Sequence, residues 1–246
     1  MWKEILQIIT ALLLLIYLGF AVAFINPKAD TDNVCTQMHI EVINNRSELY
    51  LTEAQVLSWM NQAGVNPTGK KMSSIQVEAI EKALKKSKLV KKAETYKTID
   101  GSIKIKIYQR FPILRVISSQ GRNYYVDDEG KIMPVPVQFA AYVPLATGNI
   151  SEAYAQKQLY DFVAFLHKHP SWNEDIEQIH VLPNLDVELI PNKGNHIILL
   201  GKLEQFKENL DKLELFYHKV LNKTGWNRYS VINLKYKNQV VCTKRE

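Results

Sequence analysis

Residues 5–25 read ILQIITALLLLIYLGFAVAFI, and no charged residue interrupts the chain between Glu4 and Lys28. A helix of this length rises about 30 Å, which matches the hydrocarbon core of a bilayer. A helix also satisfies the backbone polar groups within the segment, as lipid requires. We therefore predict a short tail at residues 1–4 and a transmembrane helix at residues 5–25 that contacts the lipid bilayer.

A cleaved signal peptide is the alternative, because Ala21-Val22-Ala23 has the A-x-A form of a cleavage site. The apolar run is longer than the usual stretch of about 7–15 residues, and Lys3 alone supplies the basic flank. Both observations favour a retained anchor. Lys3 and Lys28 lie on opposite sides of the segment, so charge hardly distinguishes the two orientations.

Composition describes an ordinary folded protein after this segment. The chain has 246 residues, of which 46% are hydrophobic and 23% are charged. The net charge of +6 is modest and indicates no nucleic-acid partner. Cys35 and Cys242 lie near the two ends of the part that follows the anchor. They either form a disulfide or remain two free thiols, and neither has metal-ligand spacing.

The first region after the anchor predicts the order strand, helix, helix, strand, strand. Residues 103–108 alternate isoleucine with lysine or tyrosine, which is typical of a strand with one buried face. Capping-box sequences at residues 52–55 and 73–76 predict the starts of the two helices. Residues 38–43 and 90–98 are the other strands, and Asp100-Gly101 predicts a hairpin turn between the last two.

The remaining residues predict a β-rich domain with two long helices. Asp127 to Gly130 form a turn rather than a metal or catalytic pair, because neighbouring side chains point apart. Ser151 or Asn149 caps a helix that extends to about Lys168. Strands are predicted at residues 113–119, 122–126, 176–182, 185–190, 195–200, 230–234 and 240–243. A second helix is predicted at residues 203–221. The fold class is therefore α+β.

Three short sequences carry a resemblance to a known family. Gln109-Arg110-Phe111-Pro112-Ile113-Leu114 resembles the E-R-x-P-x-A junction of the FtsQ/DivIB family of bacterial cell-division proteins. The segment YYVDDEG at residues 124–130 is similar to that family's Y-x-V-D-x-x-G turn, and VINLKY at residues 231–236 is similar to its V-D-L-R-Y strand. Gln109, Leu114, Asn233 and Lys235 depart from the common residues. Lysine lacks the planar fork of arginine, which affects any bidentate contact to a partner.

The resemblance implies a linker at residues 26–35, a POTRA domain at 36–110 and a β-domain at 111–246. It also implies a non-enzymatic scaffold that recruits FtsB/DivIC-like and FtsL-like division proteins. The implied location is the bacterial inner membrane at the division septum. The N-terminus would be cytoplasmic and the bulk of the chain periplasmic or extracytoplasmic.

The terminal hairpin is the predicted partner-binding site. A terminal strand tends to lie at a sheet edge, where unpaired backbone groups can accept a strand from another chain. In the resembled family this strand and the helix before it bind the FtsB/DivIC partner, which implies partner-binding roles for Lys235, Tyr236, Asn238, Val241 and Cys242. The alternative is a hairpin that simply closes the sheet.

No motif for nucleophilic, nucleotide-dependent or zinc-dependent catalysis is present in the sequence. The six histidines are scattered and are interpreted as surface or boundary residues. We expect no cofactor, no metal and no small-molecule substrate. Two other functions remain as alternatives: a POTRA-containing envelope assembly or transport factor, and a signal-cleaved envelope enzyme with an unrecognised site.

Overall fold

The structure is a computed structural model, and it describes residues 2–25, 33–43, 50–136, 139–173 and 175–246. Most of the predicted linker, residues 26–32, lies outside the described residues. Chain contacts define two compact units. The first comprises Met1–Glu41, Glu53–Leu84 and Ala93–Ile107, and the second comprises Val42–Thr52, Lys85–Lys92 and Tyr108–Glu246.

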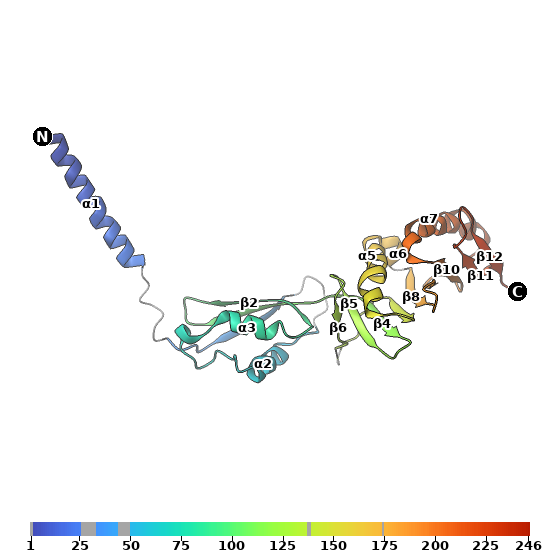
Figure 1. The fold of residues 1–246 in the computed structure, drawn as a ribbon, viewed down its shortest axis with the longest axis horizontal. Helices are drawn as coiled ribbons and strands as arrows, with labels where there is room; N and C mark the ends of the chain where they lie inside the picture. The colour runs from blue at the N-terminus through green and yellow to red at the C-terminus, as the bar shows by residue number, and fades with distance from the viewer. Residues whose placement is uncertain (1, 26–32, 44–49, 137–138, 174) are drawn as a thin grey trace. The chain divides into compact units, whose positions relative to one another are not determined.

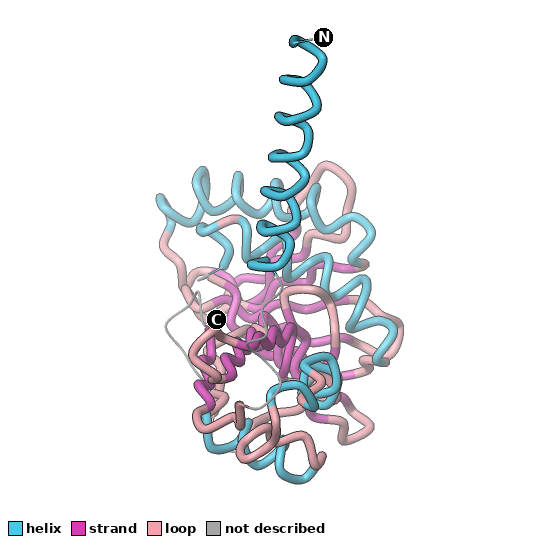
Figure 2. Tube along the Cα trace, turned by 90° about the vertical axis from the view of Figure 1, so that its left-hand side faces the viewer, coloured by secondary structure: helices cyan, strands magenta, loops and turns pink. Residues whose placement is uncertain are grey.

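The apolar N-terminal segment forms α1 (Trp2–Ile25), an uninterrupted helix (Figure 2). Its large apolar side chains from Ile5 to Phe20 are exposed. Among the described residues, the stretch Trp2–Ala21 is the one helix long and apolar enough to cross a membrane. The predicted helix is therefore present, and its exposed apolar surface is what a bilayer would cover.

A three-stranded sheet in the order β1-β3-β2 carries two helices in the first part of the chain (Figure 1). The elements are β1 (Met38–Ile43), α2 (Glu53–Gln62), a 3₁₀ turn (Met72–Ser74), α3 (Val77–Leu84), β2 (Val90–Lys97) and β3 (Ile103–Gln109). The predicted alternation holds, because Ile103, Ile105 and Ile107 are completely buried. The helices contribute Val56, Met60, Ile80 and Leu84 to this core.

The start of the second helix differs from the prediction. Residues Met72–Ser74 form a 3₁₀ turn, Ile75 is extended, and α3 begins only at Val77. Met72 and Ile75 are both buried. Packing of these two apolar side chains therefore fixes the local backbone, and it overrides the capping-box sequence.

The second unit is built on a nine-stranded mixed sheet in the order β12-β11-β10-β9-β8-β7-β4-β5-β6. The pairs β4–β7, β7–β8 and β10–β11 are parallel, whereas the other neighbouring pairs are antiparallel. The strands are β4 (Pro112–Ser118), β5 (Asn123–Asp127), β6 (Ile132–Met133), β7 (Leu145–Gly148), β8 (Ile176–Val181), β9 (Val187–Pro191), β10 (Ile197–Gly201), β11 (Tyr229–Asn233) and β12 (Val241–Lys244).

Two helical segments pack on this sheet, with α5 against β4 and α7 against β10 (Figure 1). The first consists of α4 (Glu152–Tyr154), a π-helical turn (Ala155–Leu159) and α5 (Tyr160–Lys168), and α6 (Pro170–Asn173) follows it. The second consists of a 3₁₀ turn (Leu203–Gln205), α7 (Phe206–Phe216), a π-helical turn (Tyr217–Leu221) and α8 (Asn222–Thr224). Ser151 caps the first segment, because its hydroxyl accepts the Tyr154 N–H at 3.2 Å.

One apolar core joins these helices to the sheet. Ala155, Leu159, Phe162 and Leu166 are buried and form the inner face of the first helical segment. Leu210, Leu213 and Tyr217 are the corresponding buried residues of the second helical segment. The fold is therefore α+β, with an apolar N-terminal helix, a small three-stranded region and a large mixed-sheet unit.

Candidate partner-binding site

The C-terminal strand β12 lies at one end of the nine-stranded order. It pairs antiparallel with β11 through Asn233↔Val241, Ile232↔Cys242 and Val231↔Thr243. On its other side the described residues place no strand, so that side offers backbone N–H and C=O groups to an incoming strand. The opposite end of the order is β6, which has only two residues. The terminal hairpin is therefore the longer open edge.

Two of the five predicted contact residues expose apolar surface beside this edge. Tyr236 is 49% exposed and Val241 is 46% exposed. Cys242 is half-buried, packs against the core and is a free thiol, as is the buried Cys35. Asn238 has φ of 60° in the turn, a left-handed conformation that asparagine tolerates better than most residues. Asn238 thus fixes the conformation of the hairpin turn, and Cys242 packs the hairpin against the core.

Lys235 makes an intramolecular ion pair. Its Nζ lies 2.9 Å from Oδ2 of Asp186, whose side chain is 13% exposed. The hydrogen bond from Lys235 lowers the pKa of the Asp186 carboxyl, and the same bond raises the pKa of Lys235. Lys202 lies 3.5 Å from the other carboxylate oxygen. The chain segment after β11 is therefore fixed to the turn before β9.

A second lysine supports the hairpin from α7. Lys212 Nζ donates to the carbonyl oxygens of Leu234 and Tyr236, the latter at 2.8 Å. Burial lowers the pKa of Lys212. Sequence analysis missed Asp186, Lys202 and Lys212, which lie 16 to 49 residues away in the chain from the backbone or side-chain groups they contact. No local pattern marks such distant partners.

The junction and turn sequences meet at the start of the second unit. Arg110 Nη1 lies 2.5 Å from Oδ2 of Asp127, which is completely buried. The other oxygen of Asp127 accepts the backbone N–H groups of Glu129 at 2.9 Å and Lys131 at 2.7 Å. Asp127 thus organises a turn that ends at Gly130, whose φ is 75°. The turn interpretation is confirmed.

The adjacent acidic residue has a different role. Asp128 pairs with Lys91 at 3.3 Å, and Lys91 also lies 3.2 Å from Glu129. These side chains are partly exposed, and the hydrogen bond from Lys91 is the main cause of the lowered pKa of Glu129. Asp127 and Asp128 therefore pair with different cations, and Glu129 links the two pairs because it also lies 3.4 Å from Arg110 Nη1. Among the described residues no group of three or more His, Cys, Asp or Glu side chains could hold a metal ion.

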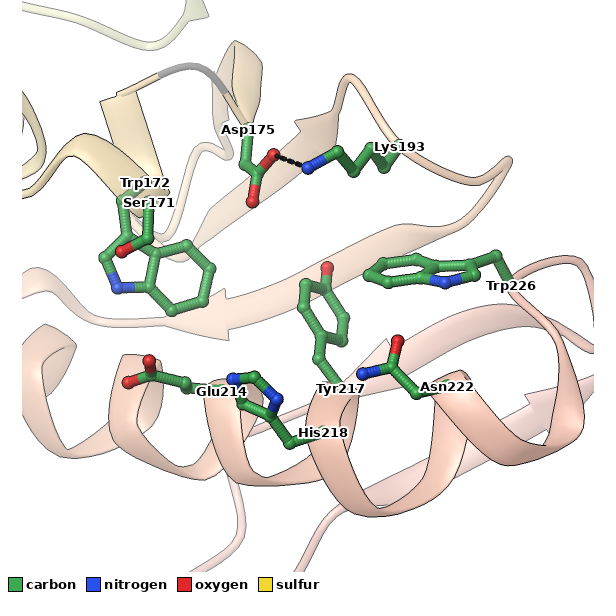
Figure 3. A pocket seen from close by; sticks show the side chains of 9 residues that line it. All are labelled: Ser171, Trp172, Asp175, Lys193, Glu214, Tyr217, His218, Asn222 and Trp226. Atoms are coloured by element: carbon green, nitrogen blue, oxygen red, sulfur yellow. Dashed lines mark ion pairs between the residues drawn. The ribbon is translucent and has the colours of Figure 1, made fainter.

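An open pocket of about 300 Å³ lies between α6, the β9–β10 turn and α7 (Figure 3). Aromatic rings form much of its wall, and an ion pair of 3.0 Å joins Asp175 to Lys193 at its rim. The lining residues are Ser171, Trp172, Asp175, Lys193, Glu214, Tyr217, His218, Asn222 and Trp226. This lining combines flat apolar surfaces with carboxylates, as in sites that receive a polar or cationic side chain.

A buried histidine contacts Tyr217, one of the aromatic residues that line this pocket. His196 is 3% exposed, and its Nε2 lies 2.9 Å from the hydroxyl of Tyr217. The interpretation of every histidine as a surface or boundary residue is therefore wrong for His196. Burial lowers its pKa, and the nearby Arg245 adds to that effect. The alternation of buried Ile198 and Leu200 in β10 extends back to His196, and this signal could have found it.

These features define a class of protein. An apolar N-terminal helix is followed by a small three-stranded module and a larger mixed sheet with an open C-terminal edge. This organisation fits a single-pass membrane protein that presents two folded modules for protein contacts.

Comparison with protein families assigns the class more closely. The model described as "FtsQ/DivIB, C-terminal related" matches residues 111–243, and a POTRA-like domain model matches residues 33–108. The chain belongs to the FtsQ/DivIB family. Proteins of this family are non-enzymatic scaffolds related to cell division. No curated protein gave a significant match to the chain.

Proposed function

We propose that the chain is a single-pass membrane scaffold of the bacterial division machinery that binds a partner strand along β12. The observation that carries the proposal is the edge position of β12, with Tyr236 and Val241 exposed beside it. Membership of the FtsQ/DivIB family supports the link to division. The proposed partners are FtsB/DivIC-like and FtsL-like proteins.

The proposed mechanism is strand addition. Backbone groups on the open side of β12 pair with an extended segment of the partner and provide affinity. Tyr236 and Val241 contact partner side chains and provide selectivity. Lys235, Asn238 and Cys242 act indirectly by holding the hairpin in shape, since each has the internal role described above.

The anchor gives this binding its location. In the proposal α1 crosses the inner membrane with the N-terminus in the cytoplasm, and both modules lie outside the cytoplasm at the septum. A short tether raises the effective concentration of the edge for partners anchored in the same bilayer. The scaffold works by position, so we propose that the chain catalyses no reaction.

Co-purification tests the binding edge directly. Tyr236→Lys and Val241→Lys place a charge beside β12, where it must be desolvated when a partner strand docks. We expect each variant to lose the FtsB-like partner while its thermal unfolding midpoint stays close to that of the wild type. Ile117→Lys is the matched control, because Ile117 is 38% exposed on β4, which lies six places from β12 in the sheet order. Partner recovery equal to wild type in both edge variants would contradict the proposed edge.

Location and processing are tested separately. A fluorescent fusion to the full chain should form a band at mid-cell in dividing cells, whereas uniform envelope signal would contradict a septal scaffold. The intact mass of the membrane-extracted protein should include residues 1–25. A mature chain that lacks these residues and is recovered in the soluble fraction would instead support the signal-cleaved alternative.

A further inference from the structure

The turn between β2 and β3 exposes an apolar side chain without packing it. Ile99 has 108% relative exposure, the largest value among the exposed apolar residues. The turn around it is well determined by hydrogen bonds: Thr98 N–H donates to Ser102 O at 3.0 Å, and the Asp100 carboxylate accepts the Ser102 N–H at 3.2 Å. The hydrogen-bonded turn therefore keeps the Ile99 side chain exposed, outside the core.

This turn lies at the end of the first unit where the chain arrives from α1. Ile103 N–H donates to Gln37 O at 3.1 Å, so the start of β3 lies beside the residues that precede β1. Met72 N–H donates to Asn33 O at 2.9 Å, and Lys97 Nζ donates to Met72 O. These contacts gather segments 33–37, 70–72 and 97–104, which we term the tether-end surface.

The tether-end surface is apolar at its tip and basic around it. Val34 adds a second exposed apolar side chain, at 44%. Its charged residues are four lysines against the single carboxylate of Asp100, which gives a net charge of +3. The lysines are Lys70, Lys71, Lys97 and Lys104. An apolar tip surrounded by lysines is complementary to a bilayer surface, where the tip can reach the acyl region and the lysines can contact anionic headgroups.

Covalent geometry keeps this surface near the membrane. Eight residues, 26–33, separate the end of α1 from Val34. Even a fully extended chain of that length spans at most about 30 Å. If α1 crosses the bilayer, as the proposed function holds, the tether-end surface stays within this distance of the headgroups. Such confinement favours a weak surface contact that a free protein would not sustain.

We propose that the tether-end surface binds the bilayer itself, with Ile99 inserted at the interface and the lysines facing anionic phospholipid headgroups. The inference rests on the anchoring role of α1. It differs from partner binding at β12, which uses another part of the chain. The contact would hold the first unit against the membrane and restrict its rotation about the tether.

Photo-crosslinking from lipid tests the contact on the full chain. The protein is placed in vesicles of phosphatidylcholine and phosphatidylglycerol that contain a phospholipid with a photoreactive headgroup, and it is digested with trypsin after irradiation. Cleavage after Lys97 and Lys104 releases residues 98–104, which contain Ile99. Residues 4–28 report on the anchor, and residues 116–122 are the matched control, since they carry the exposed β4–β5 turn and the 38% exposed Ile117.

We expect lipid adducts on residues 98–104 and 4–28 and none on residues 116–122. Ile99→Ser should abolish the adduct on residues 98–104 without lowering the thermal unfolding midpoint. Lys70→Gln, which keeps both tryptic sites of this peptide, or vesicles of phosphatidylcholine alone, should reduce that adduct. An adduct on residues 4–28 without one on 98–104 would overturn this inference and leave the anchor intact, whereas no adduct on either peptide would overturn both. A photoreactive residue at position 99 that captures a protein rather than lipid in native membranes would also overturn it.

Discussion

Lys235 and Asp186 lie 49 positions apart in the chain, and their side chains meet at 2.9 Å. Lys235 belongs to the sequence that resembles the family's terminal strand, whereas Asp186 lies in the turn before β9. The carboxylate is 13% exposed and the lysine side chain is 45% exposed. This pair connects the terminal hairpin to the sheet, and it gives Lys235 a positioning role.

Lys235→Met should lower the free energy of unfolding of the second unit by about 1 kcal/mol, because the pair is only partly shielded from water. The lowered pKa of Asp186 means that this contribution is present above the ordinary aspartate pKa. It is lost as the pH falls through the lowered folded-state value. Urea unfolding at neutral pH should therefore separate the variant from the wild type, and the gap should narrow as the pH falls below the ordinary aspartate pKa.

Lys237→Met is the matched control for this pair, since Lys237 lies two residues further on and makes no ion pair in the described chain. It should leave the unfolding free energy unchanged within about 0.5 kcal/mol. An equal loss in the Lys237 and Lys235 variants would show that general charge, rather than the contact with Asp186, sets stability here.

Asp127→Ala should be far more destabilising. The carboxylate is completely buried, pairs with Arg110 and accepts two backbone N–H groups. Its removal leaves two backbone donors without their partner and leaves the mostly buried Arg110 guanidinium with the longer 3.4 Å contact to Glu129, which costs about 3–5 kcal/mol. Tryptophan fluorescence during urea unfolding measures this loss. Asp128→Ala, which breaks a partly exposed pair with Lys91, should cost less than about 1 kcal/mol. Similar losses in the two variants would contradict the assigned difference in role.

Local pattern predicted much of the fold because the physical causes are local. Alternating isoleucines at 103, 105 and 107 are all buried, and Ser151 caps its helix. Both effects act within a few residues, through strand geometry and a side-chain hydrogen bond. The exposed anchor follows in the same way from an uninterrupted apolar run of the required length.

Pairing between distant segments could not be read from the same patterns. Period-two alternation does not distinguish the parallel neighbours β4 and β7 from antiparallel ones, nor does it give the order of nine strands. At the candidate site, the hairpin was predicted, but the Asp186 and Lys212 contacts depend on that order. The five site residues therefore looked equivalent in sequence, although two expose apolar side chains and the other three have internal roles.

The buried His196 should make stability depend on pH. Its pKa is lowered in the folded state by burial first and by Arg245 second. His196 in the unfolded chain then binds a proton more readily than it does in the folded protein. Its contribution to the free energy of unfolding is therefore fully present above about pH 6.5 and falls as the pH drops below that value. The thermal unfolding midpoint of the wild type should decrease between about pH 7.5 and 5. His196→Gln should show a shallower decrease over the same range.

His218 supplies the control for that titration. It is exposed in the same pocket (Figure 3), so His218→Gln should keep the pH dependence of the wild type. If the pH dependence of the unfolding midpoint were unchanged in the His196→Gln variant and reduced in the His218→Gln variant, its assignment to His196 would be wrong.

Gly148→Ala should disrupt the centre of the large sheet. Gly148 pairs with Val181 across the parallel β7–β8 ladder and has φ of 101°, and a Cβ atom there would lie 2.1 Å from the Val181 carbonyl oxygen. Backbone strain and this clash together should cost at least about 3 kcal/mol in unfolding free energy. Gly121→Ala tests the strain alone, because Gly121 has φ of 78° with nothing within 4 Å of the added atom, and it should cost about 1 kcal/mol. Urea unfolding of both variants measures the difference, and a loss at position 148 no greater than at position 121 would mean that β7 and β8 separate without penalty.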